Sequence, residues 1–210
     1  MIEKLHYITQ GNTKEEQLRF AQQACKAGVQ WLQFRMKIED LNLIEETALE
    51  VKKVCDHYNT KFIVNDRVEL AAKLNADGVH IGKNDMNPKE ARDIIGEKMI
   101  LGCTSNTFED IEKVHQYADY MGLGPFRFTT TKQNLSPVLG LNGYEIIIQQ
   151  MESEGIKIPV IAIGGILVDD IDDLMKTGIH GIAVASLINQ STEKELIVEQ
   201  IQNKLMYEHS

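Results

Sequence analysis

Two aspartates stand out because each closely follows a short apolar run. Asp66 comes just after Phe62–Val64, and Asp85 comes a few residues after a second such run. The segment between the runs, 67–74, has a helical pattern, so residues 61–85 are typical of a strand–helix–strand unit. Such connections are right-handed and make the two strands parallel, so both carboxylates are expected at the same end of the sheet.

Carboxylates at the ends of adjacent strands can share one hard cation, because neighbouring strands lie about 4.8 Å apart. Without a cation they would repel each other unless one took up a proton. Magnesium prefers about six oxygen ligands, usually one or two carboxylates with phosphate oxygens and water. We therefore predict half of a metal–diphosphate site at Asp66 and Asp85. The alternative is that Asp66 is the N-cap of the helix that follows it.

The segment Gln33-Phe34-Arg35-Met36-Lys37 alternates polar and apolar side chains. On a strand this places Gln33, Arg35 and Lys37 on one face and the two apolar residues on the other. Two cations on one face suggest a lining that meets an anion. The alternative is that Lys37 is a solvated loop residue and Arg35 a structural ion-pair partner.

Two further segments carry groups suited to oxyanions. Residues 128–132, Phe-Thr-Thr-Thr-Lys, open a long loop that ends near Gly140. Loops of this length in compact domains are often functional, although this one could also be a flexible solvated loop. Gly164-Gly165 and Ser186 follow two late apolar runs. Glycine permits close backbone approach, so these positions are candidates for a phosphate cradle.

Composition narrows the class of protein. The chain has 210 residues, of which 43% are hydrophobic and 25% charged, and its net charge is −9. These values indicate one globular domain, and the negative charge disfavours nucleic acid and anionic membranes as partners. We see no signal peptide and no membrane span, so we expect a cytoplasmic protein. Three scattered cysteines, Cys25, Cys55 and Cys103, fit a reducing compartment and no zinc knuckle.

The elements that must position these residues alternate along the whole chain. We predict strands over residues 5–9, 31–35, 61–65, 78–81, 99–102, 120–124, 159–163 and 181–185. We predict helices over residues 14–27, 41–58, 67–74, 88–95, 108–117, 143–154, 169–176 and 193–207. This order predicts an α/β fold, a (β/α)8 TIM barrel forming a single domain over residues 1–210. An open doubly wound sheet is the alternative, but residues 7–11 lack its usual glycine fingerprint.

In a barrel of this kind, chemistry collects at the carboxyl ends of the strands. That rule selects Thr9, Gln10, Gln33, Arg35, Lys37, Asn65, Asp66, Asp85, Thr104, Ser105, Gly124, Gly164, Gly165 and Ser186. None of the six histidines has metal-ligand spacing, and we expect a structural role for His80, which lies within a strand.

Taken together, the motifs resemble the thiamine-phosphate synthase family and its relative, the thiazole tautomerase. The matching pieces are WLQFRMK, FIVNDRVELAAKLNADGVHIGKNDM, LGCTSNT, DYMGLGPF, TTTK, SPVLGLNGY, PVIAIGGI and GIAVAS. They cover nearly the whole chain. The NDR-to-D stretch combined with T-x-T-K is specific, whereas either motif without the other is much weaker.

The resemblance implies a magnesium-dependent transferase on a barrel. Such an enzyme joins hydroxymethylpyrimidine diphosphate to a thiazole phosphate and releases pyrophosphate. The resemblance implies that Mg2+ is bound by Asp66 and Asp85. It assigns the pyrimidine diphosphate to Gln33, Arg35, Lys37, Asn65 and Lys132, with Arg35, Lys37 and Lys132 stabilising the leaving group. It assigns the thiazole phosphate to Thr129, Thr131, Gly165 and Ser186, and places Thr104 near the pyrimidine.

Several positions depart from the family pattern. Phe34 and Met36 replace Leu and Glu, on the face away from the proposed site. Lys83 stands where Gln is common, and residues 126–128, Phe-Arg-Phe, replace a usual Ile-Phe-Pro. Asn106 stands where relatives often carry the His that serves as the catalytic base of a tautomerase.

Two other functions stay open at this point. One is a tautomerase-like isomerase that acts on a thiazole phosphate carboxylate and needs neither diphosphate nor metal. The other is a non-catalytic barrel that binds a phosphate ligand. The sequence also leaves the oligomeric state open, with a homodimer as one option.

Overall fold

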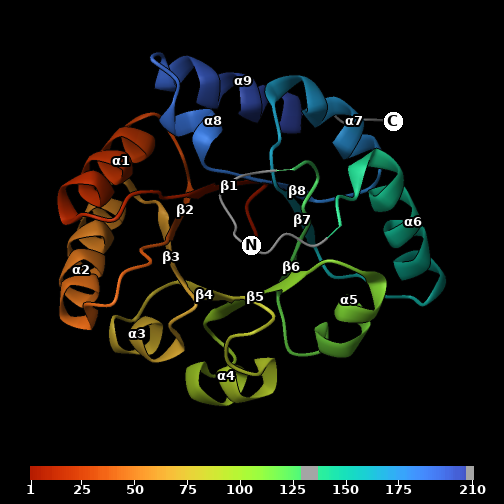
Figure 1. Cartoon of the computed structure of the whole chain (residues 1–210), viewed down its shortest axis with the longest axis horizontal. Coiled ribbons are helices and arrows are strands. Elements are labelled where there is room, and N and C mark those ends of the chain that lie inside the picture. The colour runs from red at the N-terminus through yellow and green to blue at the C-terminus, as the bar shows by residue number, and fades with distance from the viewer. Residues whose placement is uncertain (129–136, 207–210) are drawn as a thin grey trace.

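The computed structural model describes residues 1–128 and 137–206, and these form a closed barrel of parallel strands surrounded by helices (Figure 1). Each strand pairs with its neighbours in chain order, and β8 pairs with β1 to close the ring. The strands are β1 (Leu5–Ile8), β2 (Trp31–Phe34), β3 (Lys61–Asn65), β4 (Gly78–Ile81), β5 (Ile100–Ser105), β6 (Tyr120–Leu123), β7 (Val160–Ile163) and β8 (Gly181–Val184). The predicted (β/α)8 barrel is confirmed.

The helices cover the outside of this ring. They are α1 (Lys14–Lys26), α2 (Leu41–Tyr58), α3 (Val68–Lys73), α4 (Pro88–Ile95), α5 (Phe108–Val114), α6 (Gly140–Ser153), α7 (Ile171–Lys176), α8 (Ser186–Asn189) and α9 (Lys194–Met206), with a 3-10 turn, η1 (Val168–Asp170), before α7. Several bounds differ by up to three residues from those predicted: α5 ends three residues early, and α6 begins three residues early. β5 runs three residues beyond its predicted end, and the short α8 was not predicted because it has no apolar repeat of its own.

Local signals explain where several helices begin and end. Thr13 forms a capping box with Glu16 at the start of α1. Asn87 accepts a hydrogen bond from the Lys89 amide, next to a proline in the first turn of α4. Gly28, just after α1, has φ +95°, a conformation that favours glycine. These local signals fix the bounds of α1 and the start of α4.

Side chains fill the barrel in two layers. One cluster, which includes Trp31, Ile63 and Tyr120, lies inside the ring of strands, and a larger cluster packs between strands and helices. Gly102 makes room for Tyr120, since a Cβ at Gly102 would lie 2.1 Å from the Tyr120 Cζ. The barrel is therefore a packed core, and only its rim is free for chemistry.

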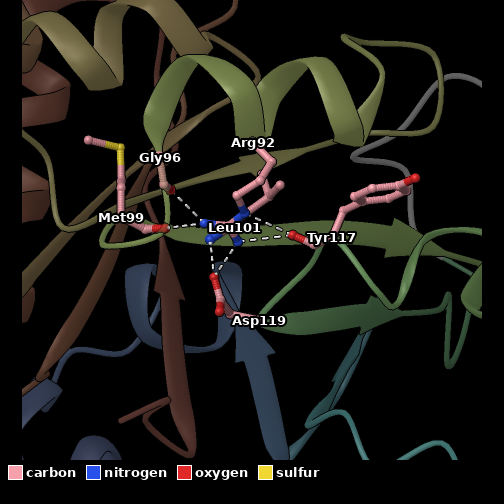
Figure 2. A network of polar contacts seen from close by, with 6 residues as sticks. All are labelled: Arg92, Gly96, Met99, Leu101, Tyr117 and Asp119. Atoms are coloured by element: carbon pink, nitrogen blue, oxygen red, sulfur yellow. Dashed lines mark hydrogen bonds and ion pairs between the residues drawn. The ribbon is translucent and has the colours of Figure 1, made fainter.

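The amino-terminal rim of the barrel is held by Arg92 (Figure 2). The guanidinium of this α4 residue, which is 9% exposed, donates to the carbonyls of Gly96, Met99 and Tyr117. It also lies 2.7 Å from Asp119 Oδ2, which accepts the Leu101 amide as well. The contacted groups lie just before or at the start of β5 and β6. The network therefore connects the beginnings of these two strands. Groups at this end of such barrels serve stability.

Within the two described ranges, no helix is both long and apolar enough to cross a membrane.

Candidate active site

The end of β2 presents its polar side chains toward the barrel interior and rim. Phe34 and Met36 are 2% and 4% exposed and belong to the core between strands and helices, as the alternation predicted. The opposite face therefore carries Gln33, Arg35 and Lys37. Gln33, which is itself buried, donates from Nε2 to Asn65 Oδ1 at 2.7 Å, and so joins the ends of β2 and β3.

Asp66 occupies a sharp turn directly after β3. Its φ is +65°, in the left-handed region that non-glycine residues seldom adopt. Its amide donates to the His80 carbonyl at 2.8 Å, which holds the turn against β4. The N-cap of α3 is Arg67, with no capping hydrogen bond from a side chain, so the alternative role of Asp66 as a helix cap is wrong. Unusual backbone conformations of this kind cluster at functional sites.

Asp85 folds back onto the end of β4. Its Oδ2 accepts the Gly82 amide at 2.7 Å, and a Cβ at Gly82 would lie 2.7 Å from the same oxygen. Partial burial raises the pKa of Asp85, and the adjacent Asp66 carboxylate raises it further, against the effects of the Gly82 amide and Lys37. The structure thus places two carboxylates where they disfavour each other's charge.

The chemistry of this pair fits a hard cation, because a divalent ion would relieve the repulsion between the carboxylates. In the described ranges no group of three or more His, Cys, Asp or Glu side chains could hold a metal ion. Asp66 and Asp85 could therefore supply only part of a coordination shell. Magnesium commonly completes its shell with phosphate oxygens and water, so a diphosphate substrate fits the remainder.

A hollow of about 580 Å3 opens beside these strand ends, and its lining includes Lys37, Asn65, Asp66 and Asp85. Lys37 Nζ lies 3.2 Å from Asp66 Oδ2. Burial lowers the pKa of Arg35, and the Asp66 carboxylate acts in the opposite direction. The guanidinium is thus partly desolvated next to the carboxylate pair, where its electrostatic interactions are stronger than in water. Another hollow, of about 510 Å3, lies between α1 and α2 and contains none of the predicted site residues.

Thr104, on β5, lies at the end of a chain of polar contacts inside the barrel. His80 Nε2 lies 3.0 Å from Thr104 Oγ1, and His80 Nδ1 lies 2.9 Å from the Tyr120 hydroxyl. Gly122 leaves room for this ring, since a Cβ there would lie 2.9 Å from the His80 Cε1. His80 therefore has the structural role expected of it, and it also orients the Thr104 hydroxyl, which sequence reasoning missed.

The residues predicted to form a phosphate cradle, Gly165 and Ser186, lie at the ends of β7 and β8. Gly165 has φ +68°, and its carbonyl accepts from Arg127 Nη1 at 2.6 Å. Arg127 also makes a two-pronged ion pair with Asp170, both contacts at 2.8 Å. Ser186 is exposed and begins α8 immediately after β8. Because β7 and β8 are paired, Gly165 and Ser186 follow adjacent strand ends.

The structure therefore brings Gln33, Arg35, Lys37, Asn65, Asp66 and Asp85 together at the ends of β2, β3 and β4. Gly165 and Ser186 form a second group, at the ends of β7 and β8. Three predicted residues, Thr129, Thr131 and Lys132, lie outside the described residues. The Arg127–Asp170 pair was missed because nothing in the spacing of two residues 43 positions apart announces their contact.

Comparison with known proteins agrees over nearly the whole chain. Residues 5–188 match the family model described as thiamine monophosphate synthase. The thiamine-phosphate synthase of Flavobacterium psychrophilum is 52% identical over 206 residues, which cover 98% of this chain and 100% of that protein. The thiamine-phosphate synthase of Bacteroides fragilis is 49% identical over 190 residues, covering 90% and 93% of the two chains.

Solved structures give the same picture. Thiamine phosphate pyrophosphorylase from Pyrococcus furiosus superposes with a TM-score of 0.81 at 29% identity, covering 96% of this chain and 95% of that one. A 3-hexulose-6-phosphate synthase superposes with a TM-score of 0.70 at 14% identity, covering 97% of this chain and 100% of that one. The second likeness shows a shared barrel fold and nothing further.

Proposed function

The chain belongs to the thiamine monophosphate synthase family, and we propose that it is a transferase that makes thiamine phosphate. Its substrates are 4-amino-2-methyl-5-hydroxymethylpyrimidine diphosphate and a thiazole phosphate, and pyrophosphate is the second product. The observation that carries this proposal is the convergence of two cationic side chains, two amides and two carboxylates at the ends of β2, β3 and β4.

The first group of residues suits the pyrimidine diphosphate. Arg35 and Lys37 supply cations, and Gln33 and Asn65 supply amides that orient each other through their hydrogen bond. We assign magnesium to Asp66 and Asp85. Lys132 would add a third cation by family resemblance. The Thr104 hydroxyl, oriented by His80, faces the pyrimidine in this assignment.

We assign the thiazole phosphate to Thr129 and Thr131 with Gly165 and Ser186. Support comes from adjacent strand ends, since phosphate sites of barrels commonly lie after strands seven and eight. The Arg127 contact to the Gly165 carbonyl fixes the backbone of this cradle from the side of β6.

In the proposed reaction, the carbon–oxygen bond between the pyrimidine methylene and the diphosphate breaks, and its electron pair leaves with the pyrophosphate. The electron-rich aminopyrimidine carries the resulting positive charge until the thiazole nitrogen forms the new carbon–nitrogen bond. Arg35 and Lys37 hold the diphosphate and stabilise the charge that develops on it. Magnesium, when bound, neutralises further charge on the diphosphate oxygens. No side chain needs to act as a nucleophile.

Neither alternative function gains specific support from the described residues. A tautomerase of this family needs a catalytic base at position 106, where this chain has Asn106, whose side-chain amide donates to the Gly124 carbonyl. A phosphate-binding barrel could use the same carboxylates and cations, and turnover in the experiment below distinguishes it from the synthase. A cytoplasmic location and a homodimer stay predictions.

Detection of thiamine phosphate by mass spectrometry tests the proposal. The purified chain is incubated with both substrates and magnesium, and control reactions omit either substrate. Thiamine phosphate should form only in the complete mixture. Isomerisation of a thiazole phosphate carboxylate without metal would instead establish a tautomerase, and binding of thiazole phosphate without any turnover would leave a ligand-binding barrel.

A further inference from the structure

The hydrogen-bond ladder between β1 and β2 changes character at its last step. The Thr9 amide donates to the Gln33 carbonyl at 3.0 Å, as in a regular parallel pair. The next bond of such a ladder would run from the Arg35 amide to the Thr9 carbonyl. Here the Thr9 hydroxyl accepts the Arg35 amide at 2.9 Å. This explains why β1 ends at Ile8 and β2 at Phe34, each one residue before its predicted end.

A second buried side chain binds the carbonyl of the same residue, Arg35. Gln17 Nε2, from α1, donates to the Arg35 carbonyl at 2.9 Å and to the Gly11 carbonyl at 2.8 Å. The backbone of Arg35 is therefore hydrogen-bonded to Thr9 through its amide and to Gln17 through its carbonyl. Gly11 lies in the loop that connects these two residues, so loop and strand end are held as one unit.

Burial shows that neither residue can touch a substrate. Thr9 and Gln17 are both 0% exposed. In the described part of the chain Gln17 Oε1 has no hydrogen-bond partner. A buried amide oxygen without a partner lowers stability, and this cost accompanies the two hydrogen bonds that Gln17 Nε2 donates to the Arg35 and Gly11 carbonyls. Residues that break such a rule are expected mainly at functional sites.

We propose that Thr9 and Gln17 are positioning residues, which fix the Arg35 backbone so that its guanidinium meets the diphosphate of the substrate. The inference rests on the proposed function, in which Arg35 binds that diphosphate. An arginine side chain is long and flexible, so only some of its conformations meet a fixed anion. The position of its Cα decides which conformations those are. Pre-organisation of this kind lowers the ordering cost of binding.

Thr9 offers a sharp test because its hydroxyl can be removed without changing its shape. Thr9→Val removes the acceptor for the Arg35 amide, whereas Thr9→Ser keeps it. Thr60→Val is the matched control, since the Thr60 hydroxyl is also buried and donates to a backbone carbonyl, that of Val29, at 2.8 Å. Thr60 precedes β3, at the opposite end of the barrel.

The first readout is binding of inorganic pyrophosphate with magnesium, measured by calorimetry on the full chain. Thr9→Val should weaken this binding by about 5- to 20-fold, because a misplaced binding group loses a large part of its interaction. Thr9→Ser and Thr60→Val should stay within about 2-fold of wild type, although Thr60→Val should unfold a few degrees lower, by about the same amount as Thr9→Val. Amide hydrogen exchange at Arg35 should accelerate in Thr9→Val only.

The second readout separates the two substrates in turnover. Thr9→Val should raise the KM for the pyrimidine diphosphate and leave the KM for the thiazole phosphate unchanged. Equal losses of pyrophosphate affinity in Thr9→Val and Thr60→Val would mean general loosening and would overturn the inference. So would wild-type affinity in Thr9→Val despite faster exchange at Arg35, or a wild-type protein that binds no pyrophosphate. If the wild type binds pyrophosphate but makes no product, the proposed function fails and the affinities of the variants still decide the inference.

Discussion

Lys37 Nζ lies 3.2 Å from Asp66 Oδ2, across the carboxyl ends of β2 and β3. The contact places the Lys37 ammonium group beside the predicted carboxylate pair. The Lys37 side chain is 58% exposed, and an exposed ion pair of this kind contributes only about 0–1 kcal/mol to stability. The pair can therefore open at little cost when a cation replaces Lys37 at Asp66, which would leave the ammonium group for the diphosphate.

Replacing either carboxylate of the pair should abolish most of the activity. We expect Asp66→Asn and Asp85→Asn to lower kcat at saturating substrates by about 100-fold or more, since a metal that stabilises the leaving group contributes several kcal/mol. Asp85→Asn should not lower the free energy of unfolding, because it removes repulsion from Asp66. Steady-state rates and thermal unfolding measure the two effects.

Asp93→Asn, an exposed change on α4, is the control for these variants and should keep wild-type activity. Near-normal turnover in Asp66→Asn at saturating substrate and magnesium would contradict the metal assignment.

Activity should depend on the hydroxyl of Thr104 and not on its methyl group. Thr104→Ser keeps the contact with His80 and should retain activity within about 2-fold. Thr104→Val loses the hydroxyl and should lower kcat/KM by about 10-fold, which corresponds to one hydrogen bond of about 1.4 kcal/mol. Kinetics with the pyrimidine diphosphate varied at saturating thiazole phosphate measure the difference. Equal activity in the two variants would remove Thr104 from the site.

Replacing Arg92 should lower the stability of the fold without changing the binding of either substrate. Arg92→Lys keeps the charge but cannot reproduce the donors that reach three carbonyls and Asp119. We expect the free energy of unfolding to fall by about 3–5 kcal/mol, as when a buried polar network is broken. At low temperature, where the Arg92→Lys variant is still folded, its KM values should equal those of wild type. The reason is that Arg92 lies at the end of the barrel opposite the site. Denaturant unfolding and kinetics at about 15 °C test this, and a selective rise in one KM would contradict it.

His6 should make stability depend on pH. Burial lowers the pKa of His6 well below 6.5, and the nearby His80, His180 and Lys61 lower it further against the effect of the Glu3 carbonyl. Below pH 6.5 the His6 imidazole is protonated in the unfolded chain but stays neutral in the folded chain. Stability is therefore complete above 6.5 and is lost as the pH falls toward the folded pKa, by up to about 1.4 kcal/mol per pH unit.

His6→Phe isolates this contribution, because a Phe ring can keep the stacking on Trp31, in which ring centroids lie 4.1 Å apart. Denaturant unfolding between about pH 7.5 and about pH 5.5 should show a loss of stability that is smaller in the variant by roughly 1 kcal/mol. The same loss in both proteins would mean that other groups carry the pH dependence.

Much of the fold follows from sequence because periodicity and position agree. Lys61–Asn65, Gly78–Ile81, Leu41–Tyr58 and Pro88–Ile95 were predicted with their exact bounds, since each has a clear apolar pattern and a clear stop. The rule that chemistry lies at carboxyl strand ends then placed Gln33, Asn65 and Asp66 beside one another without any knowledge of their distances.

The remainder depends on contacts that spacing does not reveal. Thr9 was one of many strand-end candidates, and only its buried bond to the Arg35 amide distinguishes it. Gln17 lies on the buried face of α1 with Ala21 and Ala24, so its one signal was a polar residue among apolar ones. α8 is too short to have a periodic pattern, and β5 was cut short because Cys103-Thr104-Ser105 lacks a continuous apolar run.

Pyrophosphate release tests the central claim most directly. The purified chain is given pyrimidine diphosphate and thiazole phosphate together and each separately, with magnesium or with EDTA. The account predicts release that needs both substrates and stops when EDTA removes the metal. Absence of release from a folded protein that still binds thiazole phosphate would contradict the synthase assignment, and release unaffected by EDTA would contradict the role of Asp66 and Asp85.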